Sequence, residues 1–139
     1  SSISLEERRR AETAFSEALA IRRQLAQDNP ATYLPDIAMT LNNLGVLYSA
    51  TQRMKDAEIA YSEAIFIRRE LTKANPTVYS DDLAKSLLWM AITLATQAQD
   101  ASRTCALVLE ARHLAVSANV TALATQVFEK LCSSNATQK

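Results

Sequence analysis

The sequence is almost without glycine and proline: its 139 residues include 1 Gly and 3 Pro. A single glycine excludes a glycine-rich phosphate loop, and so little turn chemistry disfavours a protein built from many tight β-turns. Residues that favour helix, chiefly Ala, Leu, Glu, Gln and Arg, dominate instead. We therefore predict an all-α protein, with residues 1–139 forming a single domain around a packed core.

The sequence also has no excess of positive or negative charge, because 15 Lys and Arg residues balance 15 Asp and Glu residues. No net field would attract such a chain to nucleic acid or to anionic lipid, so we expect neither as a partner. No window approaches the ~20 continuous apolar residues of a membrane span. The N-terminus also lacks the basic and then apolar layout of a signal peptide, so we expect a soluble cytoplasmic protein.

Catalytic and metal-binding chemistry has little support in the sequence. The only histidine is His113, and its one carboxylate neighbour in helical register is Glu110, which does not make a metal site. No Ser, Cys or acidic residue has a recognisable nucleophile setting, and the carboxylates are scattered rather than paired. We predict no catalytic residue, no metal, no cofactor and no enzymatic activity.

The two cysteines, Cys105 and Cys132, are too few for a disulfide framework, and a helical domain of this size does not need one. We interpret both as small buried apolar residues. A redox or bridging role is the alternative.

An internal repeat is the main signal. At an offset of 46 positions, residues 14–25 align with residues 60–71, and the Asn-Pro pair at 29–30 aligns with the pair at 75–76. A fixed period of this length is typical of a solenoid, in which each unit buries its apolar face against its neighbours. We therefore predict stacked helical units.

Each unit has the pattern of an antiparallel helical hairpin. Apolar and small side chains recur at i, i+3, i+4 and i+7 on two consecutive segments, which a short polar stretch at 51–53 separates. Small residues let the two backbones approach, and tyrosines fill the remaining space. The residues of this pattern are Leu41, Leu44, Gly45, Tyr48, Ala57, Tyr61 and Ala64.

In order and spacing, these seven residues resemble the signature of the tetratricopeptide repeats, with Leu41 where that family usually has Trp. The period is longer than the common unit of that family and is similar to the variety found in kinesin light chains and bacterial scaffold proteins. The resemblance implies a right-handed α-α superhelix, here of about six antiparallel helices. We divide the chain into a half-repeat helix at 5–27, a full repeat at 36–74, a degenerate repeat at 82–117 and a capping helix at 119–133.

The resemblance also implies a function, since in this family the first helix of each hairpin lines a concave groove that binds a peptide or protein segment. The candidate groove residues are Met39, Asn42, Asn43 and Val46 on one first helix, and Lys85, Leu88, Trp89 and Ile92 on the next. The two Asn side chains can replace hydrogen bonds that a peptide backbone loses on leaving water; the alternative is that one braces a loop. Trp89 either anchors a partner or packs under the last two helices.

Two further features bear on partners. The Arg pairs at 22–23 and 68–69 lie late in second helices, where the helix dipole and Glu residues one turn back favour them, so we interpret them as structural rather than as an anion clamp. Lys85 is the only cation of the groove stripe, so a clamp for a free carboxylate is not expected.

The alternative function is a structural segment that forms a homodimer or docks on neighbouring repeats through residues 5–27.

Overall fold

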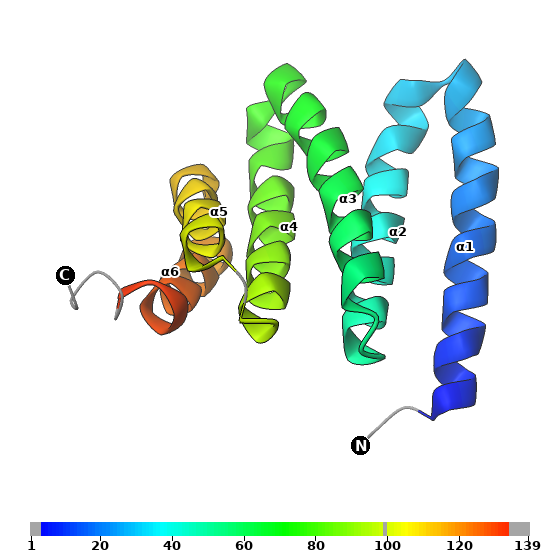
Figure 1. Ribbon diagram of the computed structural model, residues 1–139. Coiled ribbons are helices and arrows are strands. Elements are labelled where there is room, and N and C mark those ends of the chain that lie inside the picture. Colours follow the sequence, from blue (N-terminus) through cyan, green and yellow to red (C-terminus); the bar gives the residue numbers. More distant parts are fainter. Residues whose placement is uncertain (1–3, 99, 134–139) are drawn as a thin grey trace. The chain divides into compact units, whose positions relative to one another are not determined.

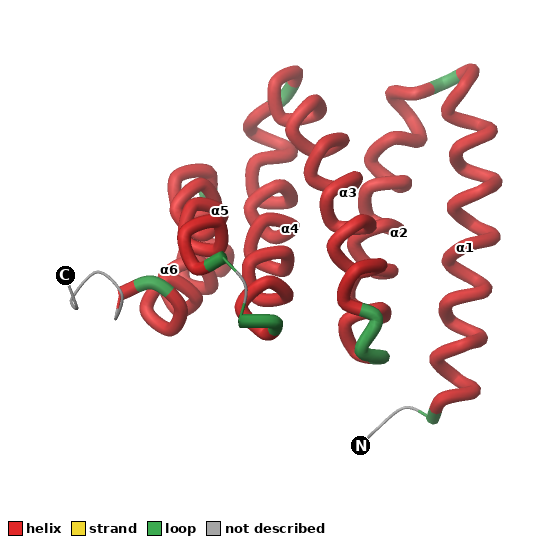
Figure 2. The backbone as a smooth tube through the Cα atoms, viewed as in Figure 1, coloured by secondary structure: helices red, strands yellow, loops and turns green. Residues whose placement is uncertain are grey.

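The computed structural model describes residues 4–98 and 100–133. Over these residues the chain forms six α-helices and no strand (Figures 1 and 2), which confirms the predicted all-α class. The helices are α1 (Leu5–Asp28), α2 (Pro30–Ala50), α3 (Met54–Ala74), α4 (Pro76–Thr96), α5 (Ala101–Leu114) and α6 (Ala118–Leu131). None of these helices combines the length and the apolar character that crossing a bilayer requires.

The chain divides into two compact units, Ser1–Ile67 and Arg68–Lys139, and the boundary falls inside the continuous helix α3. In the first unit, α1 and α2 run side by side as an antiparallel pair (Figure 1). The first part of α3 packs on α2 where Gly45 faces Tyr61. In the second unit, α4 packs on α5 and α6, and α5 packs on α6.

Proline sets where two of the helices begin. The sequence placed the repeats from 36 and from 82, with the Asn-Pro stretch as a connection, whereas α2 begins at Pro30 and α4 at Pro76. Proline suits the first helical position because the N–H that it lacks would have no partner inside the helix there. A one-residue connection at Asn29 therefore joins α1 to α2, and Asn75 joins α3 to α4 in the same way.

Side-chain caps fix three other helix starts. Ser4 Oγ accepts a hydrogen bond from the N–H of Glu7 at 3.1 Å, and the order Ser-x-x-Glu is that of a capping box. Asp100 accepts from the N–H of Arg103 at 3.0 Å, and Ser117 accepts from the N–H of Val120 at 3.2 Å. Each bond satisfies an N–H that has no acceptor within its own helix.

Each unit has its own set of buried apolar side chains, and in the first unit most of the predicted hairpin pattern belongs to this set. In the first unit they include Ile37, Ala38, Leu41, Leu44, Ala57, Tyr61 and Ala64. In the second unit they include Leu83, Leu87, Met90, Ala91, Leu94, Val108, Ala111, Val120 and Ala124. Helix α1 has no buried residue at all.

The contact between Gly45 and Tyr61 shows why α2 needs a glycine. Tyr61 is completely buried, and a Cβ atom built at Gly45 would lie 2.5 Å from Tyr61 Cε1. Real Cβ atoms do not approach a carbon this closely, so any larger residue would force the buried ring to move. The predicted pairing of a small residue on one helix with a tyrosine on the next is confirmed at this position.

Candidate functional site

On the first unit, the predicted stripe lies along one face of α2. Met39 is 46% exposed and Val46 is 37% exposed, and Asn43 between them is also exposed. Asn42 is half-buried and already takes part in an interaction within the protein. The stripe therefore offers two apolar side chains and one amide to a partner, rather than the predicted pair of amides.

On the second unit, the predicted stripe on α4 is only partly accessible. Lys85 is exposed, Trp89 is 40% exposed and Ile92 is half-buried. Leu88 is only 1% exposed, so its prediction as a groove residue is wrong. The reason is its register: Leu88 directly follows Leu87 and lies on the flank of the packing stripe, where an aliphatic side chain is covered.

Beside this stripe the second unit has a surface hollow of about 670 Å³ between α4 and α6. Most of its accessible lining is apolar, and its rim carries amide and charged groups. The lining residues are Ile92 from α4 and Leu123, Gln126, Val127, Glu129, Lys130 and Leu131 from α6. Ile92 therefore joins the predicted stripe to the hollow, one helical turn after Trp89.

The residues that α6 contributes to this hollow were missed because the sequence suggested only a capping role for that helix. A signal was present, since Leu123, Val127 and Lys130 follow the i, i+4, i+7 spacing of one helix face. Val127 is 7% exposed and Leu123 is 36% exposed. Helix α6 thus covers α4 with one edge of its apolar face and leaves the other edge accessible.

The Arg pairs have partners that sequence reasoning did not identify. Arg22 Nη1 donates to Thr40 Oγ1 at 2.7 Å, and Arg68 Nη1 donates to Ser86 Oγ at the same distance. In both cases the acceptor lies 18 positions later in the chain, on the following first helix. The predicted structural role fits these contacts, but the partner is not on the same helix.

The second Arg of each pair makes an ion pair with a later second helix. Arg23 binds Glu63 through two hydrogen bonds of 2.6 and 2.9 Å, and Arg69 binds Glu110, its shortest contact being 2.8 Å. The hydrogen bonds with Glu63 raise the pKa of Arg23, although burial opposes this change. We call these two sets of contacts the Arg-pair networks.

Arg68 is the most buried of the four arginines in these two pairs. This side chain is only 9% exposed, and burial lowers the pKa of its guanidinium, while the nearby charge of Asp82 acts in the opposite direction. Arg68 also donates to the carbonyl oxygen of Asp82 at 3.1 Å. A cation held in this way is not available to a ligand, so the Arg pairs do not form an anion clamp.

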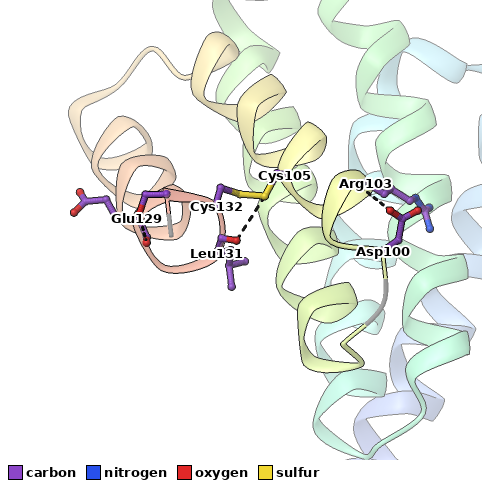
Figure 3. Close-up of a disulfide and its surroundings, with 7 residues drawn as sticks. Asp100, Arg103, Cys105, Glu129, Leu131 and Cys132 are labelled. Atoms are coloured by element: carbon purple, nitrogen blue, oxygen red, sulfur yellow. Dashed lines mark hydrogen bonds between the residues drawn. A yellow bond between two sulfur atoms is a disulfide. The ribbon is translucent and has the colours of Figure 1, made fainter. Parts of the chain in front are cut away.

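The interpretation of Cys105 and Cys132 as separate apolar residues is wrong, because the two residues form a disulfide (Figure 3). Their Cα atoms lie 5.6 Å apart, within the range that a disulfide bridges. The two residues are 27 positions apart in sequence, but the antiparallel packing of α5 and α6 brings the first turns of α5 to the end of α6. The disulfide therefore holds the end of α6 against α5, directly after Leu131, which lines the hollow.

A carboxylate holds the other end of this helix pair. Asp81 on α4 accepts hydrogen bonds from the N–H of Val116 at 2.8 Å and from the N–H of Ser117 at 3.2 Å. The bond from Val116 is the main reason why the pKa of Asp81 is lowered, and the charge of Lys85 acts in the same direction. Asp81 thus anchors the connection between α5 and α6 to α4.

For metal or acid–base chemistry, the described residues offer little. His113 is exposed on α5, and within 4–98 and 100–133 no group of three or more His, Cys, Asp or Glu side chains is placed to hold a metal ion. What the two stripes and the hollow can do is bind: they present apolar surface, amides and a few charges.

Comparisons with known proteins give no family. No protein-family model matches the chain. No curated protein matches it either.

Proposed function

We propose that this chain is a protein–protein interaction module of the tetratricopeptide type, which binds a peptide or protein segment through the exposed stripes of its first helices. The 46-residue repeat and the seven signature residues support the family, and the contact between Gly45 and Tyr61 is what such a signature would require. The module acts as a scaffold without cofactor or metal.

One observation carries the binding proposal: Trp89 is exposed on α4, one turn before Ile92 at the edge of an apolar hollow. An accessible Trp beside a concave apolar surface is the arrangement that most often contributes the largest part of a binding energy. A bulky apolar side chain of the partner would fill the hollow, where Leu123 and Val127 line it. Gln126 and Lys130 at its rim would then pair with the partner's backbone or with a carboxylate.

The stripe on α2 supports the same function on the first unit. Met39 and Val46 are exposed apolar side chains on either side of Asn43. Methionine adapts its shape to different apolar partners, and the Asn43 amide can both donate to and accept from an extended backbone. A partner bound here would gain apolar burial and one pair of backbone hydrogen bonds.

Peptide selection on the intact chain tests this proposal. Random peptides selected by display on the unmodified protein should lose about tenfold or more in affinity when Trp89→Ala is introduced, and a similar amount with Leu123→Ala. Leu109→Ala is the matched control, because Leu109 is an exposed apolar residue of α5 (52% exposed) that belongs to neither stripe nor hollow. Circular dichroism should show that all three variants remain folded.

If the selected peptides bind the Trp89 and Leu123 variants as tightly as the control, the stripe and hollow on the second unit are not the binding surface. Asn43→Ala separately tests the stripe on α2 with peptides from the same selection. A loss confined to one of the two stripes would show which unit binds.

Self-association remains a second candidate function, and the exposure of α1 favours it. Helix α1 has no buried residue, and its exposed apolar side chains include Leu5, Ile21 and Leu25. A dimer through residues 5–27 should appear in light scattering as a mass that rises with protein concentration and falls again with Ile21→Glu. A chain that stays monomeric at high concentration would eliminate this candidate.

A further inference from the structure

Glu17 on α1 lies at a repeat position where each of the other two repeats has a glutamate that forms an ion pair. Glu17, Glu63 and Glu110 align in the repeat, with the one-residue insertion before the last of them. Glu63 receives Arg23 and Glu110 receives Arg69, each from a second helix about 40 positions earlier in the chain. Within the described residues, Glu17 has neither an ion pair nor a hydrogen bond from its side chain.

The apolar residues around Glu17 are also more exposed than their equivalents in the complete repeat. Ile21 is 59% exposed, whereas its repeat equivalent Ile67 is 8% exposed. Ala14 is exposed while Ala60 is buried, and Phe15 is half-buried where Tyr61 is completely buried against Gly45 of α2. The positions that lie in the core of a complete repeat are thus open to solvent on α1.

We propose that this face of α1, with Glu17 at its centre, binds one further helical repeat unit whose second helix carries an Arg pair. The two Arg-pair networks define the chemistry of this occupant. A guanidinium would pair with Glu17 as Arg23 pairs with Glu63, and a first helix with a small residue facing Phe15 would cover the apolar face as α2 covers Tyr61.

A second copy of this chain offers no unpaired Arg pair in the register of the two networks. Arg22 and Arg23 are held by Thr40 and Glu63, and Arg68 and Arg69 are held by Ser86 and Glu110. The equivalent positions after α5 are Ala115 and Val116, and the Arg run at 8–10 lies at the start of α1, in another register. An Arg pair in this register must therefore come from a separate repeat unit, and a dimer that uses the Arg run at 8–10 instead is an outcome of the test.

A tandem duplication supplies such a unit in register. Duplicating residues 8–53 adds one period of 46 residues before the second copy of α1 and keeps the turn at 51–53. In the duplicated chain we expect the amides of the second α1 to exchange at least about tenfold more slowly than those of α1 in the original chain. Glu17→Arg in the second copy should lower the melting temperature by about 2 °C.

Two controls separate the predicted ion pair from general stabilisation. In the original chain Glu17→Arg should leave the melting temperature unchanged, because Glu17 has no partner there. In the duplicated chain, Arg23→Glu in the first copy should restore at least about half of the loss that the second-copy Glu17→Arg causes, because the exchanged charges pair again.

Three results would overturn the proposal: unchanged amide exchange in the second α1, equal effects of Glu17→Arg in both chains, or no rescue by the charge exchange. A dimer of the original chain that Glu17→Arg abolishes would also overturn it, since the occupant would then be a second copy. The site lies on α1, apart from the stripes on α2 and α4, so none of these results bears on peptide binding there.

Discussion

Asp81 does more for the second unit than its place on a helix surface suggests. It is half-buried on α4, and its carboxylate accepts from the two consecutive backbone N–H groups that directly precede α6. These N–H groups belong to Val116 and to the N-cap residue Ser117, which precede α6 and have no acceptor within it. A single carboxylate therefore satisfies two donors of the connection between α5 and α6 and ties this connection to α4.

The lowered pKa of Asp81 leads to a pH-dependent prediction. A carboxylate whose pKa is lower in the folded state adds stability above its unfolded pKa and loses it as pH falls through the folded value. Asp81→Ala should therefore lower the free energy of unfolding by about 1 kcal/mol at neutral pH. The difference from the unmodified chain should shrink below about pH 4.

Urea denaturation at several pH values measures this difference. Asp81→Asn is the matched control, because its amide oxygen can still accept from Val116 but carries no charge, so its stability relative to Asp81→Ala should not change with pH. A difference between the unmodified chain and Asp81→Ala that stays constant down to pH 3 or so would contradict the assigned role of the charge.

Residue-level prediction succeeded where the repeat fixed the environment. Gly45 and Tyr61 were both predicted to lie between the two helices of the hairpin, because only one face of each helix points to the neighbouring helix. Leu88 was misplaced because the sequence does not show how far the packing stripe extends around α4. An aliphatic residue at the edge of a stripe can lie on either side of that limit, and only its neighbours in space decide.

At the scale of helices, the disulfide is the feature that sequence reasoning could not place. Cys105 lies near the start of α5 and Cys132 directly follows α6. Their proximity depends on α6 folding back along α5, and the weak repeat pattern after residue 100 did not establish this direction. The Arg-pair networks were missed for a similar reason, because their acceptors lie 18 or about 40 positions away.

Reduction of this disulfide should destabilise the helix pair. The bridge closes a loop between residues separated by 27 positions, for which loop entropy predicts a contribution of about 3.5 kcal/mol. A reducing agent should therefore lower the free energy of unfolding of the unmodified chain, and the variant with Cys105→Ser and Cys132→Ser should match the reduced protein. The reducing agent should have no effect on that double variant.

Intact-mass measurement before and after alkylation gives the state of the thiols directly. Protein purified without reductant should remain unmodified, whereas two alkyl groups should add after reduction. Such a bridge persists in oxidising compartments and is rare where thiols are kept reduced. The cytoplasmic location predicted from the sequence thus stays a prediction, and alkylation of both cysteines in freshly lysed cells would support it.

At the scale of the whole molecule, a single continuous helix connects the two compact units. The boundary lies between Ile67 and Arg68, in the middle of α3. In repeat proteins, stability is close to a sum of unit stabilities and the coupling between neighbours. Because α3 contributes residues to both units, unwinding this helix at the boundary should weaken the coupling more than any single side chain does.

Phe66→Pro tests this coupling. Phe66 is 66% exposed, so its side chain contributes little to either core, but proline there removes a helical hydrogen bond and clashes with the preceding turn at a cost of about 3 kcal/mol or more. Trp89 is the only Trp and lies in the second unit, so its fluorescence follows that unit while circular dichroism follows all helices. In the unmodified chain both signals should change at one urea concentration, and in Phe66→Pro they should separate.

Phe66→Ala is the control, since it removes the same side chain and keeps the helix; its two signals should still coincide, and its stability should change by no more than about 0.5 kcal/mol. If the signals of Phe66→Pro also coincide, the units unfold together through contacts other than the continuity of α3. The comparison therefore distinguishes a chain whose cooperativity depends on one shared helix from a chain that folds as a single block.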